Sequence, residues 1–197
     1  MHENNLDERT LVEQARKDPQ AFGRLFDRYY DPILNYILHR TAEVHVAREL
    51  ASNTFYTALR KLWQFKWRTV PFSAWLYRIA ANEVNMHYRK RKTAPATLPA
   101  RFAHTVADEN GRTDSEIMQA EQHLAEHRVF LEMHTAIEKL KPRYQEVLVL
   151  KYFENKKISE IAQIVGKPEG TIKSLLHRAY GQLRTKLQPL YLEEMSE

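Results

Sequence analysis

Apolar residues recur at spacings of three and four along almost the whole chain, and glycine is scarce, with 5 in 197 residues. This spacing places apolar side chains on one face of an α-helix, and no run alternates as a half-buried strand would. Hydrophobic residues make up 43% of the sequence, enough for one medium domain or two small ones. The sequence therefore predicts an all-α protein.

Local signals divide the first half of the chain into helices. Asp18 and Pro19 are typical of a helix start, because aspartate caps free N–H groups and proline fits the first turn. The segment QFKWRTVPF interrupts the pattern, and Pro71 is expected to open the next helix. The apolar faces of these helices comprise Phe22, Leu25, Phe26, Tyr29, Ile33 and Ile37, then Ala47, Leu50, Ala51, Phe55, Ala58, Leu59 and Leu62, then Phe72, Trp75, Leu76, Ile79 and Met86.

The periodicity disappears between Thr93 and Ser115, where prolines, Asn110 and Gly111 lie among small and polar residues. We interpret this stretch as a linker. A long helix is expected to follow it, up to about Leu140, and Pro142 opens another. The predicted organisation is two small helical domains, 1–92 and 116–190, joined by a linker at 93–115 and followed by a tail at 191–197.

Composition excludes several classes of protein. Cysteine is absent, so disulfides, thiolate catalysis and cysteine-based zinc sites are excluded. The stretch MHENNLDERT does not resemble a signal peptide, and no run of about 18 uninterrupted apolar residues occurs. We therefore expect a cytoplasmic protein that does not insert into a membrane.

Positive charge is concentrated in two separate blocks. Residues 1–59 carry seven bases and nine acids, whereas residues 60–92 carry nine bases and one acid. A second block, 141–188, carries ten bases against four acids. Two separated cationic surfaces indicate a long polyanion as the partner.

The segment KISEIAQIVGKPEGTIKSLLHRAYGQLR has the pattern of a helix-turn-helix. Ala162 permits close helix crossing, Gly166 suits a left-handed turn, and Ile172 fixes the second helix. An ordinary helical hairpin can show the same pattern by chance, but the basic charge favours DNA binding. Side chains expected to reach major-groove edges and phosphates are Thr171, Lys173, Ser174, His177 and Arg178.

The helix that follows Pro71 ends in four consecutive bases, residues 89–92. At about 100° per residue, two asparagines and two arginines share one stripe beside its apolar face. Amides can bond base edges, arginines can hold phosphates, and aromatic residues before and within the helix can stack on unpaired bases. A solvated helix end that complements the helix dipole explains the terminal bases equally well. The residues predicted to bind single-stranded DNA are Phe65, Trp67, Arg78, Asn82, Asn85, Arg89 and Arg91.

Four segments, in this order, make the chain similar to the extracytoplasmic-function sigma factors, small two-domain promoter-recognition subunits of bacterial RNA polymerase. They are AFGRLFDRYYDPI, ARELASNTFYTALRKLW, PFSAWLYRIAANEV with the basic block after it, and LKPRYQEVLVLKYFENKKISEIAQIVGKPEGTIKSLLHRA. The resemblance covers nearly the whole chain. It implies a non-enzymatic protein, without cofactor or metal, that directs transcription initiation.

The resemblance also implies how the work is divided. The first domain, sigma region 2, would bind the polymerase clamp and capture the unpaired non-template strand of the minus-ten element, with a flipped base held between the 65–73 loop and Asn82. The second domain, sigma region 4, would dock on the polymerase flap and bind the minus thirty-five element as duplex. An anti-sigma factor is a further expected partner. Polymerase binding is assigned to Glu49, Ser52, Asn53 and Phe55.

The chain departs from the family pattern at two places. Ser52 and Asn53 replace a usual glutamine and acid, which predicts weaker affinity for the clamp. Leu175 stands where an arginine is common, which removes one basic contact with the minus thirty-five element.

Two alternatives compete with this interpretation. One is a helix-turn-helix regulator that acts without polymerase, although such a protein would not need aromatic residues beside a basic stripe. The other is a metal site: His123 and His127 fit the H-x-x-E-H pattern of inverted zinc proteases. That pattern needs a third ligand and a cleft in a mixed domain, so we interpret it as a solvated helix face, or as a chance metal site that includes His134.

Overall fold

The computed structural model describes residues 7–67, 70–93 and 135–194. Among these residues none lies in a strand, so the all-α prediction is confirmed for the described part of the chain. The N-terminal bundle contains α1 (Glu8–Lys17), the 3₁₀ turn η1 (Pro19–Ala21), α2 (Phe22–Thr41), α3 (Val44–Lys61), the 3₁₀ turn η2 (Leu62–Gln64) and α4 (Phe72–Thr93). The C-terminal helices are α6 (Pro142–Leu148), the π-helical turn η3 (Val149–Phe153), α7 (Ile158–Val165) and α8 (Glu169–Glu194).

The start of η1, which leads into α2, and the end of α2 follow from local chemistry. The Asp18 carboxylate accepts a hydrogen bond of 2.9 Å from the backbone N–H of Gln20, and Pro19 occupies the first position of η1, as the sequence predicts. At the other end Ala42 takes a left-handed conformation, with φ at 54°, which ends the helix. The chain then reverses into α3, which packs along α2 and α4.

Three local features shape the C-terminal helices. Pro142 opens α6 at its first position, as predicted. The π-helical turn η3 and the left-handed Asn155, with φ at 50°, interrupt the helical path before α7. Gly166, with φ at 70°, then ends α7 and allows α8 to begin three residues later.

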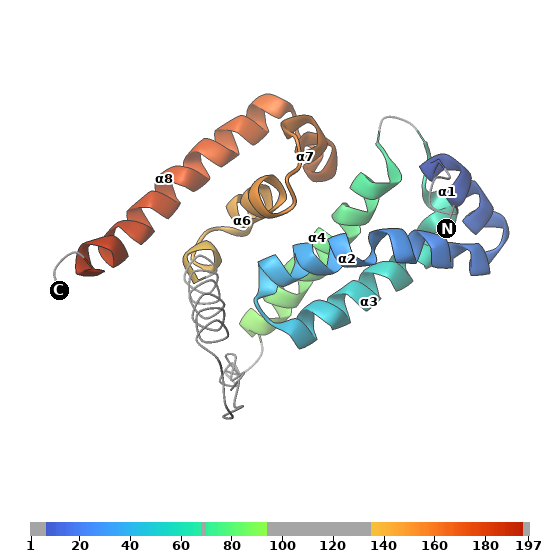
Figure 1. Ribbon diagram of the computed structural model, residues 1–197, viewed down its shortest axis with the longest axis horizontal. Coiled ribbons are helices and arrows are strands. Elements are labelled where there is room, and N and C mark those ends of the chain that lie inside the picture. Colours follow the sequence, from blue (N-terminus) through green and yellow to red (C-terminus); the bar gives the residue numbers. More distant parts are fainter. Residues whose placement is uncertain (1–6, 68–69, 94–134, 195–197) are drawn as a thin grey trace, which may run out of the picture.

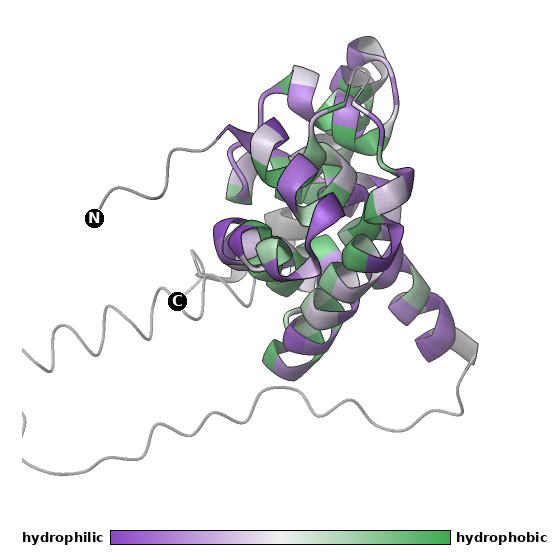
Figure 2. Ribbon diagram, turned by 90° about the vertical axis from the view of Figure 1, so that its right-hand side faces the viewer, coloured by the Kyte–Doolittle hydropathy of each residue, from purple (hydrophilic) through white to green (hydrophobic). Residues whose placement is uncertain are grey.

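The two groups of helices touch each other. In Figure 1 α7 lies near α4, and contacts join α7 to α4 and η3 to α2. Their buried apolar residues form a single cluster. Green and purple bands alternate along the helices in Figure 2, as expected when each helix turns one apolar face inward. The C-terminal helices therefore cover part of the N-terminal bundle.

Some predictions lie outside the described residues. These are the linker at 93–115 beyond its first residue, most of the long helix up to Leu140, and the pair His123 and His127 with His134. Only residues 135–140 of that long helix are described: residues 135–138 are helical, and the helix ends before residues 139 and 140. Within the described ranges no helix is both long enough and apolar enough to cross a membrane.

Candidate nucleic-acid interface

Helices α7 and α8 form the predicted helix-turn-helix. Ile161 and Ile164 of α7 and Ile172 of α8 are buried, and α8 contacts both α6 and α7, which fixes the rotation of α8 about its axis. Because every third or fourth residue of α8 turns inward, the residues between them form an outward row. The five predicted duplex-binding residues all lie exposed in that row: Thr171, Lys173, Ser174, His177 and Arg178.

Neighbouring contacts hold two of these side chains. The Ser174 hydroxyl donates to the Gly170 carbonyl oxygen at 3.0 Å. Arg178 lies near the Tyr144 hydroxyl on α6, which accepts a hydrogen bond from Arg143 at 3.0 Å. Leu175 is only 8% exposed, so the position where the family often has arginine belongs here to the core. Leu175 therefore contributes to the packing of α8 and does not belong to its outward row.

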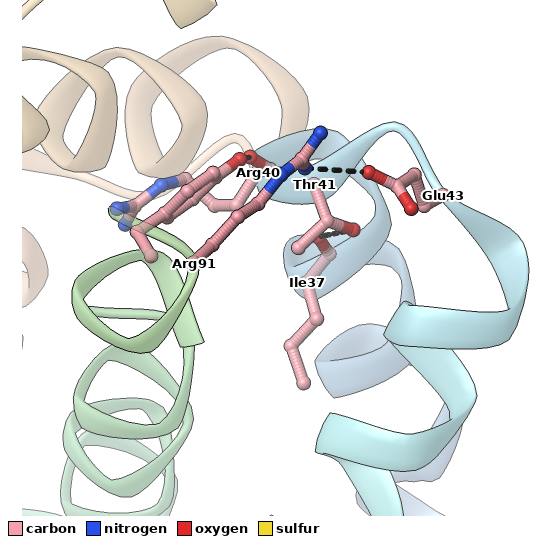
Figure 3. A network of polar contacts seen from close by, with 6 residues as sticks. Ile37, Arg40, Thr41, Glu43 and Arg91 are labelled. Atoms are coloured by element: carbon pink, nitrogen blue, oxygen red, sulfur yellow. Dashed lines mark hydrogen bonds and ion pairs between the residues drawn. The ribbon is translucent and has the colours of Figure 1, made fainter. Parts of the chain in front are cut away.

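The predicted single-strand stripe on α4 is divided by the fold. Asn82 and Arg89 are exposed. Asn85 is half-buried, and its Oδ1 accepts from the Arg40 guanidinium of α2 at 3.3 Å. Arg91 pairs with Glu43 at 2.8 Å, the contact drawn as a dashed line in Figure 3. Asn82, Arg89 and Arg91 are thus exposed on the surface, whereas Asn85 is partly covered.

Arg78 lies under the C-terminal helices. Its Nε donates to the Ile164 carbonyl oxygen at 2.9 Å, and its Nη2 donates to the Gln163 carbonyl oxygen at 2.5 Å. These carbonyls belong to the last turn of α7, where oxygens lack partners within the helix and the dipole favours a cation. Arg78 therefore caps α7 instead of facing solvent.

Tyr77 makes the adjacent contact between the two groups. Its hydroxyl donates to Glu154 Oε2 at 2.6 Å, and Lys156 Nζ lies 5.1 Å from its ring centroid. Burial, the Glu154 charge and this hydrogen bond all raise the pKa of Tyr77. Burial also raises the pKa of Glu154, against the opposing effect of the Tyr77 hydroxyl and Lys156. Together with Arg78, this contact forms a polar latch between α4 and the C-terminal helices.

The aromatic residues before α4 pack on one another. Phe65 is 4% exposed, and its ring meets those of Trp67, Phe72 and Trp75 at centroid distances between 5.0 and 5.6 Å. Phe65 therefore has no free face on which a base can stack in this structure. Trp67 is half-buried and lies edge-on to Phe65, at the rim of the cluster.

The predicted polymerase-binding residues of α3 divide in the same way. Glu49, Ser52 and Asn53 are exposed, but Phe55 is 4% exposed and packs against Phe26 of α2 with ring centroids 4.8 Å apart. Phe55 supports this face from behind, as its place in the predicted apolar stripe already indicated.

Sequence reasoning missed three exposed residues that continue the same face. Tyr56 is 61% exposed, Arg60 lies over its ring at 5.7 Å, and Trp63 is 74% exposed. Spacings of three and four connect them to Asn53, so large aromatic residues that fall outside an apolar stripe were the available signal.

Among the described residues no group of three or more metal-ligating side chains comes together.

Comparisons with known proteins identify the family. Residues 25–94 match the model "Sigma-70 region 2", and residues 130–183 match "Sigma-70, region 4". The chain is 34% identical over 185 residues to the ECF RNA polymerase sigma factor SigW of Bacillus subtilis, covering 91% of this chain and 96% of SigW. The chain belongs to the extracytoplasmic-function sigma factors of the sigma-70 family. The predicted family and general function, an RNA polymerase sigma factor, are thereby confirmed.

Other relatives of this sigma factor agree. The RNA polymerase sigma factor YlaC of Bacillus subtilis is 31% identical, covering 90% of this chain and 98% of YlaC. The ECF sigma factor BldN of Streptomyces coelicolor is 33% identical, but the chain spans only 61% of its length. The solved structure of CnrH, in complex with the cytosolic domain of CnrY, is 24% identical with a TM-score of 0.65, covering 93% of this chain and 99% of that one. It supports the fold alone.

Proposed function

We propose that this sigma factor binds the minus thirty-five element as duplex through α8. The supporting observation is the outward row of Thr171, Lys173, Ser174, His177 and Arg178, set above a buried face that fixes its direction. Hydroxyls, lysine, histidine and arginine supply donors for phosphates and for base edges in the major groove. Recognition by a helix in that groove requires such a row.

The minus-ten element, in this proposal, meets α4 and Trp67, which follows η2. Asn82 offers its amide to an unpaired base, Arg89 holds the phosphate backbone, and Trp67 lines the edge of the same region. Phe65 contributes by packing beneath Trp67. Asn85 and Arg91 join only if they leave their present partners, Arg40 and Glu43.

Core RNA polymerase is proposed to bind the exposed face of α3. Glu49, Ser52 and Asn53 begin this face, and Tyr56 extends it with a large, rigid side chain of the kind that dominates binding energy at interfaces. Phe55 keeps the helix in place from the core side.

Promoter binding also requires the latch to open, since Arg78 cannot reach DNA while it caps α7. In the proposed cycle, polymerase and promoter hold the two domains apart, and α4 is then uncovered. The protein acts without catalysis of its own, in the cytoplasm, where it would meet polymerase and DNA. An anti-sigma factor remains an expected partner from family membership.

Initiation from defined promoters tests this proposal. Purified chain is added to core polymerase, and run-off transcripts are measured on a library of promoter variants. Sequence-dependent transcripts that need both elements and vanish without the chain are expected. Duplex binding that occurs equally well without polymerase, with no transcripts, would contradict the proposal. Sequencing of DNA bound in cells, with identification of co-purified proteins, would name the promoters and any anti-sigma factor.

A further inference from the structure

Helix α1 holds both ends of the connection between η2 and α4. One Glu8 oxygen accepts from the Ser73 backbone N–H at 3.1 Å, and the other accepts from the Phe72 N–H at 3.2 Å. At the far end of the connection, Arg16 Nη2 donates to the Phe65 carbonyl oxygen. Glu8 and Arg16 are eight residues apart, about 12 Å along the helix. One short helix therefore bridges the two points where this connection begins and ends.

Glu8 supplies a cap that α4 lacks locally. The residue before Phe72 is Pro71, whose side chain has no acceptor for the free N–H groups of the first turn. A carboxylate at this end also complements the helix dipole. The Tyr29 hydroxyl of α2 donates to Glu8 at 2.5 Å and fixes the carboxylate in place. Burial, and then the bond to Glu8, raise the pKa of Tyr29, so this hydroxyl stays a donor at any ordinary pH.

Arg16 fixes the other end. Its Nη1 pairs with Glu13 at 3.1 Å, which orients the guanidinium toward the Phe65 carbonyl. Phe65 in turn sets the position of Trp67, since their rings meet edge-on at 5.0 Å. Small displacements of Phe65 would therefore move Trp67 directly.

We propose that α1 sets the minus-ten preference of this sigma factor by clamping the η2–α4 connection through Glu8 and Arg16, which act as positioning residues. The inference rests on the proposed minus-ten role of Trp67 and Asn82. Base selection needs donors and stacking surfaces held within a fraction of an ångström, and Glu8 and Arg16 hold the start of α4 and Phe65 in place. Neither Glu8 nor Arg16 belongs to the predicted DNA-binding or polymerase-binding set.

The test compares Glu8→Gln, Arg16→Gln and the control Lys17→Gln, which alters an exposed residue of the same helix. Holoenzyme made with each variant is bound to forked promoter DNA in which every unpaired minus-ten position carries each base in turn. For Glu8→Gln and Arg16→Gln we expect discrimination at the preferred base to fall about tenfold, the size of one lost base contact. Competition for core polymerase and binding to the minus thirty-five duplex should stay within twofold of wild type, and Lys17→Gln should match wild type throughout.

Three results would overturn the inference. Variants that discriminate as well as wild type would make α1 a purely structural helix. Equal losses in core binding, duplex binding and discrimination would mean a general defect of the fold. Tyr29→Phe removes only the hydroxyl that holds Glu8 and so provides a milder variant for the same comparison. A wild-type holoenzyme without preference at any unpaired position would overturn the minus-ten assignment itself. That failure is distinct because it appears before any substitution.

Discussion

The latch between α4 and the C-terminal helices leads to a sharp prediction for Tyr77→Phe. The substitution keeps the buried ring and removes only the hydroxyl that donates to Glu154 at 2.6 Å. A hydrogen bond to a charged group contributes about 1.5–3 kcal/mol, and Glu154 is only half-buried and keeps Lys156 nearby, so the lower end applies. About 1.5 kcal/mol corresponds to a tenfold shift from the closed to the open arrangement.

The shift can be measured directly because the chain has no cysteine. Fluorophores placed at Lys61→Cys and Gln182→Cys, both exposed, would report the distance between the two groups of helices. Single-stranded minus-ten DNA should bind Tyr77→Phe up to tenfold more tightly, since apparent affinity scales with the open fraction when that fraction is small. Tyr56→Phe, on an exposed tyrosine, is the control. Unchanged energy transfer together with unchanged DNA affinity would refute the idea that the latch covers the minus-ten face.

Three further predictions concern acid, the turn and the duplex-binding row. Burial raises the pKa of Glu154 in the closed form, so this form binds protons more readily than the open form. Closure should therefore strengthen as pH falls from that raised pKa toward the ordinary value of 4.5. Energy transfer measured across a pH series should rise accordingly, and Glu154→Gln should remove this pH dependence. Gly166→Ala should lower the free energy of unfolding by about 1–2 kcal/mol in urea titrations, because φ is 70° there. Lys173→Ala should weaken duplex binding on all sequences and flatten its salt dependence, whereas Arg178→Ala should relax preference at one position; equal losses for both on every promoter variant would mean that α8 positions without selecting.

Local patterns predicted the helices well because each signal acts on its own neighbourhood. Pro19 and Pro142 open helices where the sequence placed them, and Gly166 takes the left-handed turn. The apolar stripe of the third helix correctly indicated that Phe55 faces the core. Family motifs assigned the same residue to an interface, and motifs alone do not separate a contact residue from the side chain that supports it.

Contacts distant in sequence left no such signal. Arg78 bonds carbonyls that lie 85 and 86 residues away, and Glu8 caps a helix that begins 64 residues later. A backbone carbonyl has no residue identity, so the partners of Arg78 cannot be recognised from amino-acid type. Helical periodicity correctly placed Arg78 on a polar stripe of α4. A cation on such a stripe can bind a phosphate or the end of another helix equally well, and periodicity does not distinguish the two.

If Arg78 binds promoter DNA as proposed, its ability to meet either a helix end or a phosphate links promoter binding to domain separation. Capping α7 satisfies its guanidinium with two carbonyl oxygens, and opening without DNA would exchange these for water. A DNA phosphate presents a charged acceptor to the same planar guanidinium donors. Hydrogen bonds to a charged acceptor are shorter and stronger than those to a neutral carbonyl. In the proposed cycle, the free energy lost on opening is offset where DNA, held by polymerase, reaches α4. If Arg78 binds promoter DNA as proposed, closure and promoter binding compete for one side chain, so a stronger latch lowers the apparent affinity for the promoter.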